Sequence, residues 1–174
     1  QTPIKVMEDV DFVSVGTCHT MILKKDGSLW GTGLNNYGQL GDGSLNNSNT
    51  PVKIMEDVDF VSTKSNHTLI LKRDGSLWSV GLNNHGQLGT SNTLNSSVPI
   101  KILEGVSLVS AGTNYTMILK KDGSLWGTGW NKDGQLGTNI SDYILTPLKI
   151  MENVKNVWAG LSHTMILKID NTLW

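Results

Sequence analysis

The chain has 174 residues, enough for one ordinary domain or for a run of repeats. Its 14 Lys and Arg residues against 15 Asp and Glu leave a formal net charge of −1, which argues against strong general binding to nucleic acid or to an anionic membrane. The single cysteine, Cys18, excludes an intrachain disulfide and a multi-thiolate metal site, and no apolar run approaches the ~20 residues that span a bilayer.

The chain is built from a repeat of 48 residues. Proline and tryptophan each recur at this spacing without interruption. The prolines are Pro3, Pro51, Pro99 and Pro147, and the tryptophans are Trp30, Trp78, Trp126 and Trp174. The period divides the chain into three repeats and a partial fourth, about 3.6 units. Their boundaries are 2–49, 50–97, 98–145 and 146–174.

Each repeat has the pattern of four short strands. In the first repeat we expect them at residues 3–7, 12–15, 19–24 and 29–34. An Asp-Gly pair separates the third strand from the fourth, and this pair predicts a hairpin with a type I′ turn, which needs positive φ at both central residues. The pairs are Asp26-Gly27, Asp74-Gly75 and Asp122-Gly123, with Asp170-Asn171 in the last copy. Asn tolerates the left-handed region, so this substitution supports the turn.

The third strand does not alternate between apolar and polar residues, because Met21, Ile22 and Leu23 stand in a row. A run of this kind has both faces covered. Such strands, repeating at one fixed length without a helical period, predict an all-β fold, a β-propeller of four-stranded antiparallel blades. A two-sheet sandwich has no reason to repeat at a fixed length, and a β-solenoid usually has shorter coils.

Residues 19–41 read His-Thr-Met-Ile-Leu-Lys-x-Asp-Gly-Ser-Leu-Trp-x-x-Gly-x-Asn-x-x-Gly-Gln-Leu-Gly, and the pattern recurs at 67–89 and, with Tyr115 in place of the first His, at 115–137. It resembles the repeat of the regulator of chromosome condensation family. The segment Gly-x-Asn-x-x-Gly-Gln-Leu-Gly is the specific part, and the resemblance covers the whole chain. The sequence departs from it locally, for example at Lys64, where the first and third repeats have glycine. The resemblance implies a propeller, usually of seven blades.

Seven blades of 48 residues need about twice the length of this chain. An open arc would leave an apolar face bare at each end. Two interpretations stay open: the chain is a fragment of a longer propeller, or it forms a homo-oligomer in which two chains complete a ring of about eight blades.

The repeat supplies no convincing catalytic, metal or cofactor site. Most acidic residues recur at equivalent positions, whereas a catalytic carboxylate pair needs one asymmetric geometry. His19, His67 and His163 share one position of the repeat, which Tyr115 interrupts, so we expect them to bond between blades rather than to bind metal. The glycine-rich segments are not phosphate loops. The lysines alternate with carboxylates and form no basic stripe for DNA.

Two sets of loops differ between repeats, and both lie at the same end of an antiparallel blade. They are the turns between the second and third strands and the long loops after the fourth strand. We expect that end to be a protein-binding surface, since aromatic residues are favoured at interface hot spots. The expected anchors are Tyr37, His85, Trp130, Asp133 and Tyr143. Neutral drift of exposed loops is the alternative. Trp158, which replaces a serine of the other repeats, is expected at a seam instead.

The sequence thus predicts a non-catalytic protein-interaction module whose partner it does not identify. The family resemblance implies two alternatives, a guanine-nucleotide exchange factor for the small GTPase Ran or an enzyme inhibitor. Exchange activity in the family uses an insertion from one blade, and the uniform spacing leaves no room for one. The abundance of Asn, Ser and Thr with few charged residues favours an extracellular or cell-surface protein of bacterial type.

Overall fold

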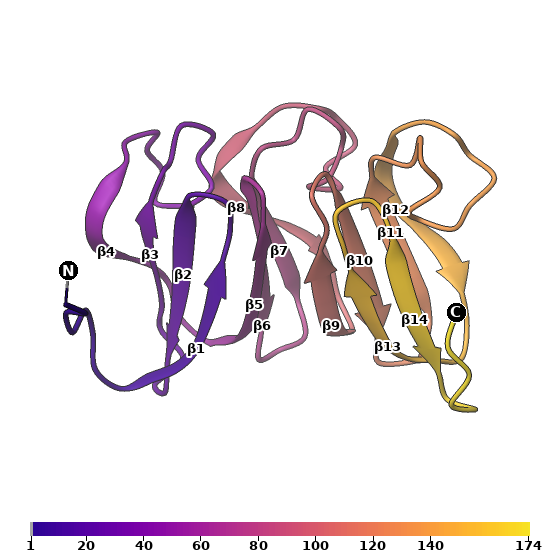
Figure 1. The fold of residues 1–174 in the computed structure, drawn as a ribbon, viewed down its shortest axis with the longest axis horizontal. Helices are drawn as coiled ribbons and strands as arrows, with labels where there is room; N and C mark the ends of the chain where they lie inside the picture. The colour runs from indigo at the N-terminus through magenta and orange to yellow at the C-terminus, as the bar shows by residue number, and fades with distance from the viewer. Residues whose placement is uncertain (1) are drawn as a thin grey trace.

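The computed structural model describes residues 2–174, which form 14 β-strands and no helix (Figure 1). The strands are β1 (Val10–Val15), β2 (His19–Lys24), β3 (Leu29–Gly33), β4 (Ser48–Met55), β5 (Val58–Lys64), β6 (His67–Lys72), β7 (Leu77–Gly81), β8 (Ser96–Leu103), β9 (Val106–Ala111), β10 (Tyr115–Lys120), β11 (Leu125–Gly129), β12 (Ile144–Met151), β13 (Val154–Ala159) and β14 (Thr164–Lys168). With no helix in this range, the structure offers no helical candidate for a membrane span.

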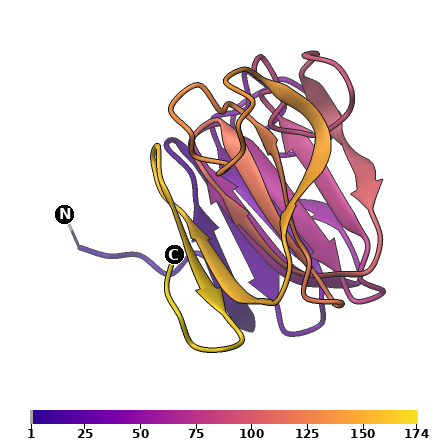
Figure 2. The same cartoon turned by 90° about the vertical axis from the view of Figure 1, so that its right-hand side faces the viewer.

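The strands form three four-stranded antiparallel sheets and one two-stranded sheet. The orders are β1-β2-β3-β4, β5-β6-β7-β8 and β9-β10-β11-β12, followed by β13-β14. Figure 1 shows these sheets fanned side by side, and Figure 2 shows them stacked face to face in the turned view. The predicted all-β architecture of four-stranded blades is confirmed, with about three and a half blades in the chain.

Blade and sequence repeat are offset by one strand. Strand β4 belongs to the second repeat but pairs with β3 of the first, with Leu29 opposite Met55. Each blade therefore takes its last strand from the following repeat. The prediction of a strand at residues 3–7 is wrong for this reason: its partner would be a strand equivalent to β3 from a preceding repeat, and the described chain contains none.

The Asp-Gly hairpins form where predicted, but the turn type differs. Gly27 has φ of 87°, whereas Asp26 is not in the left-handed region. The Gly27 amide bonds the Lys24 carbonyl at 2.9 Å, which gives a three-residue loop closed by a left-handed glycine instead of a type I′ turn.

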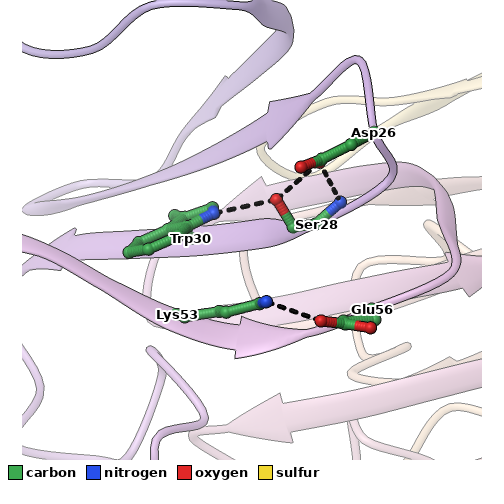
Figure 3. A network of polar contacts seen from close by, with 5 residues as sticks. All are labelled: Asp26, Ser28, Trp30, Lys53 and Glu56. Carbon is green, nitrogen blue, oxygen red and sulfur yellow. Dashed lines mark hydrogen bonds and ion pairs between the residues drawn. The ribbon is translucent and has the colours of Figure 1, made fainter.

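Side-chain hydrogen bonds stabilise each hairpin, and Figure 3 shows those of the first one. The Asp26 carboxylate accepts hydrogen bonds from the Ser28 amide at 2.9 Å and the Ser28 hydroxyl at 2.6 Å, and Ser28 Oγ accepts one from Trp30 Nε1 at 2.9 Å. The two bonds from Ser28 lower the pKa of the Asp26 carboxyl. An exposed ion pair joins Lys53 on the neighbouring strand β4 to Glu56 just after that strand. The repeated Asp-x-Ser-x-Trp pattern is therefore structural.

The core lies between the blades. Strands β6 and β10 are buried at every position but the last, as the unbroken apolar run predicted. Each junction adds a serine hydroxyl that accepts a hydrogen bond from the next blade's backbone: Ser14 from the Thr63 amide, Ser62 from the Ala111 amide and Ser110 from the Ala159 amide. Strands β1, β5, β9 and β13 lie next to one another along the inner side of the fan.

Candidate binding surface at the loop end of the blades

The β1–β2 turns and the long β3–β4 loops, with their equivalents in the other blades, leave the sheets at the same end. We call this end the loop face; its long loops run along the upper edge of Figure 1. The Asp-Gly hairpins lie at the opposite end. Both sets of variable loops therefore share one face, as the antiparallel order requires.

A buried asparagine organises each long loop. Asn83 donates from Nδ2 to the carbonyls of Asn92 at 2.9 Å and Leu94 at 3.1 Å, and its Oδ1 accepts a hydrogen bond from the Leu88 amide at 2.9 Å. Asn35 and Asn131 play the same part in the first and third blades. The Asn of the repeated glycine-rich segment thus holds the loop from inside, which leaves the loop tips free to differ.

Four of the five expected anchors come together on the loop face. The rings of His85 and Trp130 have centroids 4.7 Å apart, those of His85 and Tyr143 5.2 Å, and those of Trp130 and Tyr143 5.4 Å. We call these three residues the aromatic cluster. Trp130 donates from Nε1 to the Asp133 carboxylate at 3.1 Å. The cluster joins the β7–β8 loop of one blade to the β11–β12 loop of the next.

Backbone contacts explain why the aromatic cluster forms between these two blades. The Ser91 amide donates to the Leu145 carbonyl at 2.9 Å, and Gly86 lies so close to Leu145 that a Cβ on Gly86 would approach that side chain to 2.6 Å. His85 is thereby placed beside Tyr143.

Tyr37, the fifth expected anchor, lies on the loop face outside the aromatic cluster. It occupies the position of His85 one repeat earlier, where Gly38 lies against Ser96 and Ser97. The positions equivalent to Trp130 and Tyr143 are Leu82 and Asn95. Tyr37 therefore has no aromatic partners at the equivalent positions of the neighbouring repeat.

Lys132 belongs to this surface, although the sequence analysis did not single it out. Its ammonium lies 4.9 Å from the centroid of the Tyr143 ring and 5.5 Å from that of Trp130, within reach of a cation–π interaction. Partial burial, and secondarily the Lys132 charge, lower the pKa of His85 and so favour its neutral form. The position of Lys132 in the sequence, two residues after Trp130, is the signal that could have identified it.

Two of the three repeated histidines, His19 and His67, lie at blade junctions and not on this surface, whereas His163 is exposed in the turn before β14 and the bond expected for its side chain is not found. His19 Nε2 is 3.1 Å from Thr68 Oγ1, and His67 Nε2 is 3.3 Å from Thr116 Oγ1. Burial lowers the pKa of His19 to about 4 and that of His67 to about 3. Residues 2–174 contain no group of three or more His, Cys, Asp and Glu side chains placed to hold a metal ion.

The chain belongs to the regulator of chromosome condensation (RCC1) repeat family. The family model matches residues 26–71, 74–119 and 122–167, and a second model of the same repeat matches 10–39, 58–87 and 106–135. A search of curated protein sequences finds no match.

Solved structures share the fold. The crystal structure of human WBSCR16 superposes with a TM-score of 0.83 at 23% identity, covering 94% of this chain and 46% of that one. A chain of yeast RCC1 (Prp20) bound to Kap60 gives 0.81 at 22% identity, covering 94% and 42%. Saccharomyces cerevisiae Prp20p, whose structure was described together with its binding to Gsp1p and histones, gives 0.79 at 22% identity, covering 91% and 43%. The chain thus spans less than half the length of these relatives.

Proposed function

We propose that the protein is a non-catalytic interaction module that binds a protein partner through the loop face. The supporting observation is the convergence of His85, Trp130, Asp133 and Tyr143, from loops of two blades, at one exposed place. These positions differ between otherwise similar repeats, so the blades do not require them.

The aromatic cluster suits a protein hot spot for a physical reason. Its three rings are partly exposed, and each is restrained by the other two. A partner that buries them gains apolar contact area without first ordering long side chains. Asp133 and Lys132 supply a charge of each sign at the rim, where they can fix the orientation of the partner.

Affinity capture with three forms of the protein tests this proposal. The forms are the wild type, the triple variant His85→Ala/Trp130→Ala/Tyr143→Ala, and a control, Arg73→Ala/Lys121→Ala, whose changes are exposed at the opposite end of the blades. We expect proteins enriched by the wild type and the control to fall about tenfold or more with the triple variant, because each hot-spot side chain contributes on the order of 1–2 kcal/mol. A captured set that is unchanged in the triple variant would contradict the assignment.

Exchange-factor activity is the second candidate, because Prp20p was described with its binding to Gsp1p. A nucleotide-release assay with a Ran-type GTPase tests it directly. We expect no acceleration: the three long loops have equal spacing in the sequence, and none carries the extra segment that exchange activity uses in the family. Enzyme inhibition is a special case of protein binding and would appear as a captured enzyme.

A further inference from the structure

We propose that the aromatic cluster receives the arginine side chain of a protein partner, and that Lys132 occupies this place in the free protein. The inference rests on the proposed function and specifies the chemistry that the loop face recognises. The three rings lie at the junction of the β5–β8 and β9–β12 sheets, both of which have all four strands. Their arrangement therefore does not depend on the ends of the chain.

The rings already hold a cation in the free protein. The Lys132 ammonium lies 4.9 Å from the centroid of the Tyr143 ring and 5.5 Å from that of Trp130. Both distances are within the ~6 Å at which the negative face of an aromatic ring attracts a cation. His85 favours its neutral form and so adds no fixed positive charge beside the rings. The Lys132 ammonium therefore marks a place that stabilises a positively charged group.

Two carboxylates lie beside the rings and favour a cation there. Trp130 donates from Nε1 to Asp133 Oδ2 at 3.1 Å, which holds one negative charge at the edge of the cluster. The Asp142 carboxylate accepts a hydrogen bond from the Tyr143 amide at 2.8 Å, which holds a second charge next to that ring. Opposite charges attract at these short distances, so a cation from a partner is favoured over an anion.

The third repeat gives up a structural hydrogen bond to place the Tyr143 ring here. In the second repeat the equivalent residue is Asn95, and its Oδ1 accepts a hydrogen bond from the backbone amide of Asn83 at 2.8 Å. The first repeat makes the same bond between its own two asparagines. Tyr143 turns its ring to His85 and Trp130 instead. The loop does not need this ring, whereas binding of a ligand gives it a role.

The cation and the two rings that it contacts are departures of the same repeat. Trp130 and Lys132 stand where the second repeat has Leu82 and Asn84, and Tyr143 is the third change. An ammonium without the rings, or the rings without an ammonium, would make no cation–π contact. The three changes therefore form one unit, which the framework of the repeat does not require.

Arginine fits this place better than lysine does. Its planar guanidinium is weakly hydrated and stacks on aromatic faces, so it loses less on leaving water than the compact ammonium of Lys132. It also carries five N–H donors, which a carboxylate accepts in short, charge-assisted hydrogen bonds. Asp133 is exposed and within reach of a partner. An arginine that enters from a partner therefore replaces the internal lysine with a stronger contact.

A nuclear magnetic resonance titration with the peptide acetyl-Gly-Arg-Gly-amide tests the proposal, and the same peptide with citrulline is its uncharged isostere. We expect the arginine peptide to shift the indole N–H resonance of Trp130 until saturation, and the citrulline peptide to leave it unchanged. Lys132→Met should strengthen arginine binding about threefold or more, because the internal competitor no longer fills the place. Tyr143→Ala should weaken the binding about fivefold, because one of the two ring faces is lost.

Lys121→Met is the matched control, since it removes an exposed lysine at the opposite end of the blades and should leave the affinity unchanged. Circular dichroism checks that each variant folds. Equal binding of the two peptides, no saturable shift in either the wild type or Lys132→Met, or weaker binding by Lys132→Met would overturn the proposal. If captured proteins still depend on the aromatic cluster in that case, the proposed function stands without arginine recognition. Arginine binding together with capture that is independent of the cluster would instead contradict the proposed function.

Discussion

Lowering the pH from 7 to about 4 is expected to destabilise the blade stack strongly, because His19 and His67 are buried in neutral form. Their pKa values are lowered from 6.5 to about 4 and about 3. The unfolded chain therefore takes up protons first as the pH falls below about 6.5, and this stabilisation is lost progressively until the folded values are reached. At about 1.4 kcal/mol for each pKa unit, His19 alone accounts for about 3 kcal/mol. Urea unfolding between pH 7.5 and pH 4 measures the effect.

The third repeat supplies the matched control. Tyr115 stands at the same position of the repeat, and its hydroxyl donates a hydrogen bond to the backbone carbonyl of His163 at 2.6 Å across the next junction. A tyrosine side chain, unlike a histidine, does not become charged in acid. His19→Tyr should fold, since Gly16 leaves room for the ring as Gly112 does for Tyr115. We expect this variant to lose less stability in acid than the wild type. Equal acid losses would show that other groups, such as the hydrogen-bonded aspartates, cause the transition.

Gly129→Ala is expected to lower the stability by more than about 3 kcal/mol, corresponding to roughly 10 °C in Tm. Gly129 has φ of 108°, outside the range that side chains adopt readily. An added Cβ would lie 2.6 Å from the Asn114 carbonyl oxygen and 2.7 Å from Tyr115 Cα, both backbone atoms that cannot move aside. Because Gly129 directly precedes Trp130, the change should also displace the aromatic cluster.

Gly134→Ala separates the strain of a positive φ from the clash with neighbouring backbone atoms. Gly134 also has positive φ, at 76°, but a Cβ there would meet nothing within 4 Å. Thermal unfolding should show a loss of only about 1 kcal/mol, the strain of a left-handed residue alone. A similar loss for both variants would mean that the close backbone approach at Gly129 is unimportant.

The sequence was most informative where the repeat holds. The strands and hairpins follow from residues such as Leu29, which recurs in each copy, and Gly27, which recurs in all but the last, because every blade imposes the same packing and turn. It failed at residues 3–7, where local pattern favours a strand but the pairing partner comes from another repeat. The turn type was also misjudged: Asp-Gly permits several hairpins, and the Ser28 bonds to Asp26 favour the one observed.

The loop surface could be located from the sequence, but its cluster could not. Variation between repeats indicated the end of the blades and residues such as His85 and Tyr143. Their contact depends on how one blade's loop lies against the next blade, which no local pattern records. The exclusion of Tyr37 has the same origin, since it depends on Leu82 and Asn95 in a different repeat.

The one-strand offset between repeat and blade affects how the fold comes apart. Melting the second repeat would strip β4 from the first sheet, because that strand belongs to the second repeat. Without β4, the first sheet would expose the unpaired backbone donors and acceptors of β3. Disorder therefore spreads from one sheet to the next, and coupling between adjacent units exceeds what stacked, self-contained sheets would have. Because each four-stranded sheet takes its last strand from the following repeat, the chain should unfold in a single cooperative transition and not blade by blade.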